Sequence, residues 1–368
     1  MKSSGHCPHD GTRLVAIALP AQDPMVGRLL DGRYEVRAAL AQGLMGAMYR
    51  GWQLSVSREV AIKIIDPSYA QDREASERFI EAARLACQLV APSIVNVYDV
   101  GRTTDGTIYL VSELVRGNTL ASVVQQRSMS IRRVVAIAIQ LCEALDAAAR
   151  QGIVHGDLKP TNIMLDDSSG RDVVKVIDFG LARQLLPDAS RPDPRRPMPF
   201  YTAPEQAGGT VDLQTDLYAL GCLLYEMLTG GPPFTGATIE AVRAKHRDQP
   251  PPTLPPNIPG ALLEIVQRLL AKAPGDRFSS YGDLRARLAS IEAGMPRVSI
   301  SPPAPNVMPA GTLAPPNVMQ PGHPAESSVP LVTQPFAQPS GRRRIVVIAI
   351  VAILACSAGI AAYVLATS

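Results

Sequence analysis

The sequence predicts an α+β fold, with strands ahead of helices along the chain. Residues 59–65 alternate like a strand, and residues 109–115 read as a second strand. The segment that begins at Thr215 leads into a helical run that ends at Thr229 and Gly230. At 368 residues the chain is longer than one average domain, so it can bury a sizeable core and still carry further segments.

Composition narrows the function classes. The net charge of +3 is small, which argues against a dedicated nucleic-acid binder. The five cysteines are scattered and odd in number, so a disulfide framework is not expected and a reducing cytosol suits the folded part. Lys2 is followed by polar residues and not by the apolar stretch of a secretory signal.

Two spaced motifs carry the polar groups that phosphoryl transfer requires: HGDLKPTN at residues 155–162 and DFG at residues 178–180. Transfer of the γ-phosphoryl group of ATP needs a carboxylate that orients the acceptor hydroxyl, and Asp157 suits that task. Asn162 and Asp178 offer the hard oxygen ligands that Mg²⁺ accepts. Lys159 can reach the transferred phosphate. Polar residues in a solvated loop would be the alternative, but two motifs in this order argue against it.

From about Arg33 to about Ile291 the chain resembles the eukaryotic-like (Hanks-type) serine/threonine protein kinases of bacteria. Further motifs in the order of that family are VAIK at 60–63, APE at 203–205, TDLYALG at 215–221 and DRF at 276–278. The resemblance implies a two-lobed protein kinase fold over residues 33–292, with ATP in the cleft. It comprises a five-stranded antiparallel small lobe with one helix (33–112) and a mainly helical large lobe (116–292).

The resemblance also implies how the small lobe would hold ATP. Lys63 is expected to pair with the α- and β-phosphates. Residues 40–49 look like the glycine-rich loop over the phosphates, and Gly43 and Gly46 would let backbone N–H groups approach them. Ala41 replaces the first glycine of the loop, so we expect its β-carbon to hinder loop closure.

The strand at 109–115 is expected to become the hinge between the lobes, where backbone groups of Glu113 and Val115 would bind adenine. Ser112 falls where the family guards the pocket behind adenine, and this small residue is expected to leave that pocket open. The residues expected to enclose adenine are Leu40, Met48 and Ala61 on one side and Met164 on the other.

Two structural roles follow from the same resemblance. Glu205 and Arg277 are expected to form a buried ion pair. Asp216 is expected to brace the backbone of the catalytic loop, so its loss should disturb geometry as well as chemistry.

One departure from the family concerns the small-lobe helix, which normally carries a glutamate that pairs with the strand lysine. Counting back ten residues from Pro92 reaches Ala82 instead. Glu81 is adjacent, but one residue around a helix is about 100° away, so it can serve only if the helix is rotated. Lys63 is therefore expected to be less firmly placed.

Two further departures concern the segment 181–202. Gly156 stands where many kinases carry an arginine that receives a phosphorylated loop, and the segment offers few hydroxyls, Ser190 being the plainest. Activity is therefore not expected to depend on phosphorylation there. Met198 replaces a threonine that in the family contacts the catalytic Asp and Lys, which leaves the acceptor preference open.

The amino-acid composition changes at residue 293. Residues 293–341 are dense in proline and nearly free of charge, and they repeat PNVM, which predicts an extended linker. Residues 342–368 begin with three arginines, followed by 22 uncharged residues at 345–366. At 1.5 Å per residue these span about 33 Å, which predicts a C-terminal transmembrane helix. The arginines on its N-terminal side place the kinase region in the cytoplasm, and the protein in the cell membrane as a single-pass protein.

The N-terminal extension, residues 1–32, carries His6, Cys7 and His9, which resemble half of a zinc knuckle. A second half is absent from the sequence, so a disordered terminus is favoured over a metal site shared between two chains.

Together these observations predict ATP- and Mg²⁺-dependent phosphorylation of serine or threonine on protein substrates at the cytoplasmic face of a membrane. The alternative is a membrane-tethered pseudokinase that binds nucleotide or partners, which Ala41, Ala82 and Met198 favour. A small-molecule or lipid kinase fits less well, because the motifs resemble those of protein-substrate kinases. The substrate, the stimulus and the pairing of two chains into a homodimer are left open.

Overall fold

The computed structural model of the protein describes residues 5–6, 13–14, 23–43, 45–126, 129–166, 169–181, 184 and 198–296. The chain divides into two units, Met1–Ser299 and Ile300–Ser368, and every described residue lies in the first. Within this part of the chain, no helix is both long enough and apolar enough to cross a bilayer. The predicted membrane segment 345–366 and nearly all of the predicted linker lie outside the described residues.

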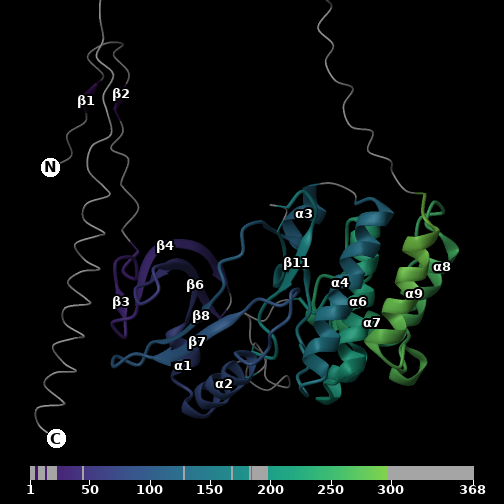
Figure 1. Cartoon of the computed structure of the whole chain (residues 1–368). Coiled ribbons are helices and arrows are strands. Elements are labelled where there is room, and N and C mark those ends of the chain that lie inside the picture. Colours follow the sequence, from purple (N-terminus) through teal and green to yellow (C-terminus); the bar gives the residue numbers. More distant parts are fainter. Residues whose placement is uncertain are drawn as a thin grey trace, which may run out of the picture. The chain divides into compact units, whose positions relative to one another are not determined.

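The small lobe is built on an antiparallel sheet with the strand order β3-β4-β5-β6-β8-β7 (Figure 1). Its strands are β3 (Leu29–Leu30), β4 (Tyr34–Gly43), β5 (Gly46–Gln53), β6 (Arg58–Ile65), β7 (Val97–Arg102) and β8 (Ile108–Ser112). The expected five strands are joined by a sixth, the two-residue β3. This strand pairs with the start of β4, where Leu30 and Tyr34 enter the core of the sheet.

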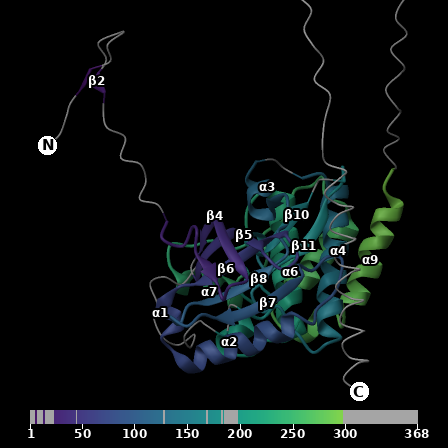
Figure 2. The ribbon, with the colours of Figure 1, turned by 60° about the vertical axis from the view of Figure 1, so that its left-hand side comes forward.

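Two helices follow β6, where the sequence predicted one. The single turn α1 (Pro67–Ala70) begins at Asp66, whose carboxylate accepts from the backbone N–H of Ser68. The long helix α2 (Arg73–Ala86) begins at Asp72, whose carboxylate accepts from the N–H of Ala75. Helix α2 lies along the sheet beside β7 (Figure 2). Its buried face, which carries Phe79 and Ala83, packs on the last residue of β6 and on β8.

The large lobe is mainly helical, as expected. The α-helices among its described residues are α3 (Leu120–Gln126), α4 (Ile131–Ala149), α6 (Leu213–Thr229), α7 (Ile239–Asp248), α8 (Gly260–Leu269) and α9 (Tyr281–Gly294). The predicted helical run is α6, which ends at Gly230 in the left-handed conformation (φ +88°). Helices α6 and α8 approach closely at Gly221, where an added β-carbon would lie 2.7 Å from Cβ of Leu269.

A small sheet packs on the helices α3 and α4 of the large lobe. It has the order β11-β10-β9, with β9 (Asn118–Thr119), β10 (Ile163–Asp166) and β11 (Val173–Val176). The HGDLKPTN motif runs through the 3₁₀ turn η1 (Pro160–Asn162) into β10, and the DFG motif follows β11. The β10–β11 hairpin therefore carries both predicted catalytic segments. Two further short strands, β1 (Gly5–His6) and β2 (Arg13–Leu14), pair with each other.

Candidate active site

Asp216 holds the backbone at the start of the HGDLKPTN motif. It lies buried in the first turn of α6, and its two carboxylate oxygens accept from the N–H groups of His155 and Gly156, each at 2.8 Å. Gly156 takes φ +72°, which glycine adopts without strain. Burial raises the pKa of Asp216, although the two amides and the charge of His155 oppose that rise. The predicted brace is confirmed.

The structure brings Asp157, Lys159 and Asn162 together. The Asp157 carboxylate accepts from Lys159 Nζ at 2.5 Å, and the Asp157 carbonyl accepts from Asn162 Nδ2 at 2.8 Å. Because its amide nitrogen is occupied by Asp157, Asn162 has Oδ1 left to offer to a cation. The Asp157 carboxylate is half-buried, so it can still reach an acceptor hydroxyl from solvent.

Asp178 is held in the cleft by the residues around it. Phe179 is buried and stacks at an angle on the His155 ring, with centroids 4.8 Å apart, while Gly180 N donates to His155 O at 3.1 Å. Asp178 itself takes φ +64°, a strained conformation for a residue with a side chain. The packing of Phe179 therefore fixes the direction of the Asp178 carboxylate.

Lys63 reaches this carboxylate across the cleft, with Nζ 2.5 Å from Asp178 Oδ2. Burial raises the pKa of Asp178, but the charge and the hydrogen bond of Lys63 outweigh it, so the pKa is lowered. Asp178 is thus ionised, as a Mg²⁺ ligand must be. Asn162 and Asp178 offer the oxygen donors that suit Mg²⁺, and Lys63 offers a cation for phosphate oxygens, so the chemistry of the donor set fits Mg²⁺-ATP.

Helix α2 supplies no carboxylate to Lys63 in the described part of the chain. Ala82 packs against the buried cluster that contains Ile65, Phe79 and Leu181. Glu81 lies on the exposed face of the helix, beside Arg84 and Arg102, around a shallow hollow. The helix is not rotated, so Glu81 does not replace the missing glutamate. The partner that Lys63 uses instead, Asp178, was not predicted.

The glycine-rich segment is formed by the ends of the paired strands β4 and β5, with Gly43 opposite Gly46. Gly46 needs to be glycine, since it has φ +139° and an added β-carbon would lie 1.9 Å from Ile64 O. Ala41 pairs with Met48 within the strands, outside the positive-φ region. Its β-carbon therefore introduces no strain, and the expected obstacle to loop closure has no support in the backbone geometry.

The predicted adenine residues lie on strands of both lobes. Ala61 is buried in β6 opposite Ser112, and Met48 of β5 is opposite Lys63. Met164 is partly buried in β10 of the large lobe. Leu40 is at an irregularity of β4 and remains 51% exposed.

The hinge begins directly after β8. Glu113 N donates to Asn96 O at 2.9 Å, and its carbonyl, which accepts from Ser112 Oγ at 3.5 Å, has a second lone pair for adenine. Val115 makes no backbone hydrogen bond to another described residue, which leaves its N–H for a ligand. The Glu113 carboxylate is bound by Lys175 and Asn96, which the sequence prediction missed. The one signal was Lys175 itself, the single charge in the apolar strand β11.

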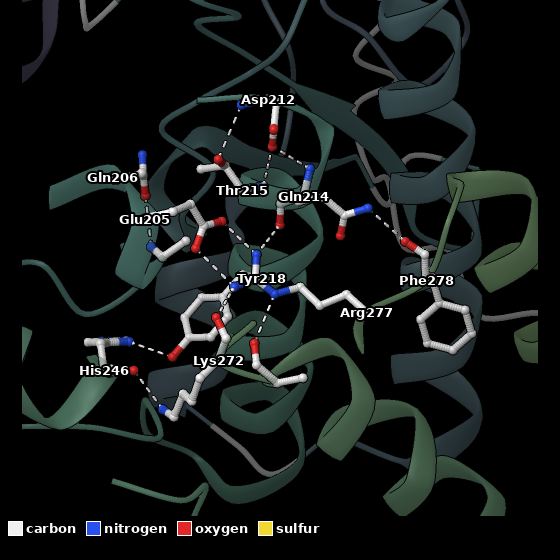
Figure 3. A network of polar contacts seen from close by, with 12 residues as sticks. Glu205, Gln206, Asp212, Gln214, Thr215, Tyr218, His246, Lys272, Arg277 and Phe278 are labelled. Carbon is white, nitrogen blue, oxygen red and sulfur yellow. Dashed lines mark hydrogen bonds and ion pairs between the residues drawn. The ribbon is translucent and has the colours of Figure 1, made fainter. Parts of the chain in front are cut away.

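The predicted Glu205–Arg277 ion pair is confirmed, and it stands at the centre of a wider polar network (Figure 3). Arg277 is fully buried and donates to both Glu205 oxygens, at 2.6 and 2.9 Å, and to the carbonyls of Gln214, Lys272 and Ala271. The network extends through Lys272, whose Nζ donates to the carbonyl of His246 at 2.7 Å. Burial lowers the pKa of Lys272 to about 8.

The activation segment is described at its two ends only. Met198 is partly buried, and its carbonyl accepts from the N–H of Phe200 at 2.9 Å. Unlike a threonine hydroxyl, its thioether cannot donate a hydrogen bond to Asp157, and it is only a weak acceptor for Lys159. Ser190, the predicted hydroxyl of this segment, lies outside the described residues.

Comparison with known proteins gives a consistent assignment. The sequence pattern of the protein kinase domain matches residues 34–287. The serine/threonine-protein kinase PknA of Mycobacterium tuberculosis is 36% identical over 307 residues, covering 79% of this chain and 70% of PknA. The probable serine/threonine-protein kinase CPE1738 of Clostridium perfringens is 35% identical over 285 residues, covering 75% of this chain and 41% of that protein.

A solved structure agrees. The kinase domain of Mycobacterium tuberculosis PknI superposes with a TM-score of 0.58 at 28% identity, over 73% of this chain and 98% of that domain.

Proposed function

Because this chain belongs to the serine/threonine protein kinase family, we propose that it transfers the γ-phosphoryl group of ATP to serine or threonine side chains of other proteins. The observation that carries the proposal is the convergence of four side chains on the cleft. Lys63 of the small lobe contacts Asp178 of the DFG motif. Asp157 and Asn162, both in the HGDLKPTN motif, contact each other. The full set of groups that phosphoryl transfer requires is therefore available in one place.

In this proposal Asp157 orients the acceptor hydroxyl and accepts its proton, while the hydroxyl oxygen bonds to the γ-phosphorus and the bond from that phosphorus to the β-phosphate oxygen breaks, which releases ADP. Lys159, already 2.5 Å from Asp157, would move its charge to the transferred phosphoryl group. Asn162 and Asp178 would hold Mg²⁺, which would offset the negative charge of the phosphates. Lys63 would exchange Asp178 for the α- and β-phosphates, so nucleotide binding has to break the ion pair that the free protein contains.

The proposed setting is the cytoplasmic face of a membrane. It is supported by the 22 uncharged residues at 345–366 and by the three arginines that precede them. The proline-rich residues 293–341 would act as the tether between this helix and the kinase domain.

The second candidate, a pseudokinase, is favoured by one observation: no helix carboxylate reaches Lys63 in the described chain. Transfer from radiolabelled Mg²⁺-ATP to the protein itself and to a generic protein acceptor separates the two. The full chain, purified in detergent, is compared with Asp157→Asn. Transfer that disappears in Asp157→Asn supports the enzyme. Transfer no greater than that of the variant, together with measurable ATP binding, supports the pseudokinase.

A further inference from the structure

The first residue of the hinge, Glu113, has its side chain fixed by two partners. Lys175 Nζ lies 3.0 Å from Glu113 Oε1 and 3.1 Å from Oε2. Asn96 donates to Oε2 through Nδ2 at 2.9 Å and through its backbone N–H at 3.3 Å. Lys175 is 15% exposed and Glu113 26% exposed, so the pair is largely shielded from solvent. We call Asn96, Glu113 and Lys175 the hinge cluster.

Both partners of Glu113 are attached to the large lobe. Lys175 belongs to β11, and the segment that contains Asn96 is hydrogen-bonded to the same strand. Val95 N donates to Val176 O at 3.0 Å, and Val176 N donates to Ser93 O at 2.9 Å. Ile94, between these residues, is buried in the core of the large lobe. The Glu113 carboxylate is therefore fixed relative to the β10–β11 hairpin and not only to its own sheet.

The far end of the hinge is fixed to the same hairpin. Gly117 takes φ +147°, and an added β-carbon would lie 2.0 Å from the carbonyl oxygen of Leu165 in β10. The hinge residues 113–117 are thus held at one end by Lys175 on β11 and at the other by close contact with β10.

We propose that Lys175 is a positioning residue for nucleotide binding, which sets the direction of the hinge carbonyl and N–H groups through its ion pair with Glu113. The proposal rests on the proposed function, in that the hinge binds adenine. In the structure that contains the Lys175 ion pair, the other site residues are also in contact. Phe179 is packed on His155, and Asp178 is paired with Lys63. Loss of the ion pair should therefore reduce nucleotide affinity and leave the transfer step itself unaffected.

The expected size of the effect follows from the fraction of hinges that remain correctly oriented. Nucleotide binds that fraction only, so the apparent dissociation constant rises in inverse proportion to it. If a freed hinge spends about one tenth to one third of its time in the bound orientation, Lys175→Met weakens ATP binding about three- to tenfold. The kcat at saturating ATP should stay within about twofold of wild type.

The test measures the Kd for Mg²⁺-ADP by calorimetry, and the KM for ATP and kcat by phosphoryl transfer, on the full chain in detergent. Lys175→Arg keeps the charge and should retain most of the wild-type affinity. Asp172→Asn is the matched control: it breaks the ion pair between Arg133 and Asp172 at 2.7 Å, at the other end of β11 and away from the hinge. Asp172 is 16% exposed, so its burial is comparable to that of Lys175.

The proposal expects weaker ADP binding in Lys175→Met, near-normal binding in Lys175→Arg and Asp172→Asn, and no further loss when Glu113→Gln is added to Lys175→Met. Unchanged or tighter ADP binding in Lys175→Met would overturn it, and so would an equal loss in Asp172→Asn. Because ADP binding needs no phosphoryl transfer, this result stands even if wild type transfers no phosphate, which would refute the proposed function alone.

Discussion

Replacing Ala82 of α2 by glutamate should strengthen the binding of Mg²⁺-ATP. Lys63 is bound to Asp178 in the free protein, and this pair has to separate before Lys63 can contact phosphates and Asp178 can hold a cation. Ala82 packs in the cluster that includes Leu181, the residue directly after the DFG motif, so its side chain points toward this side of the cleft. A carboxylate there gives Lys63 a second partner and releases Asp178.

The expected gain in ATP affinity is the difference between two larger free energies, the attraction between the new carboxylate and Lys63 and the cost of removing that carboxylate from water. Opposite charges about 4 Å apart attract by about 4 kcal/mol at an effective dielectric constant of about 20. Placing a carboxylate next to Ile65, Phe79 and Leu181 removes it from water, which offsets most of this attraction. A net gain of about 1 kcal/mol corresponds to a decrease in the KM for ATP of about fivefold.

The assay compares the KM for ATP and kcat of wild type and Ala82→Glu, with thermal unfolding as a check on folding. Leu85→Glu is the matched control, because it adds the same charge to the same helix at a position that is exposed. A well-folded Ala82→Glu protein with unchanged or higher KM would refute the view that the missing helix carboxylate weakens ATP binding. An equal decrease of the KM for ATP in Leu85→Glu would show that the added charge, and not its position next to Lys63, causes the effect.

Three further outcomes are expected. Ser112→Met should reduce use of bulky N6-substituted ATP analogues relative to ATP at least about tenfold in kcat/KM, because Ser112 lies next to the hinge carbonyl opposite Ala61; equal rejection by wild type would contradict an open pocket. Asp216→Ala leaves two buried N–H groups without acceptors, so urea unfolding should show a loss of about 2–6 kcal/mol, and a loss below that range would contradict the brace. Burial lowers the pKa of His246 to about 4, below the unfolded value of 6.5, so its neutral form favours folding above pH 6.5 and this contribution declines as the pH falls toward 4. Chemical unfolding at pH 7.5 and pH 5 should therefore show a smaller decrease for His246→Gln than for wild type, by up to about 2 kcal/mol, and equal decreases would contradict this.

The sequence was sufficient for features that depend on local patterns. The lobes, the helix α6 with its glycine end and the Glu205–Arg277 pair follow from motifs with fixed spacing, and the structure contains them. The two-residue strand β3 was missed because two residues are too few to show a period. Whether Ala41 would hinder the loop depended on its φ angle, which residue type alone does not determine.

Two contacts could not have been predicted from the sequence because they join residues that are distant along the chain. Lys63 was expected to be less firmly placed, because Ala82 stands where the family carries its glutamate. The pairing with Asp178 depends on the positive φ of that residue and on the burial of the neighbouring Phe179. The pairing of Lys175 with Glu113 depends on how the β10–β11 hairpin lies against the hinge.

Because residues 93–96 are attached to β11, the chain is not expected to separate cleanly into two folded fragments at the hinge. A fragment that ends at Ser112 would contain Leu89 and Ile94, two apolar residues that are buried against the core of the large lobe. Such a fragment would expose them to water, and the remainder of the chain would lose part of its core. We therefore expect that the small lobe does not fold on its own. Two fragments cut at the hinge should instead complement each other when they are expressed together, which makes the hinge a natural cut site for a split reporter of assembly.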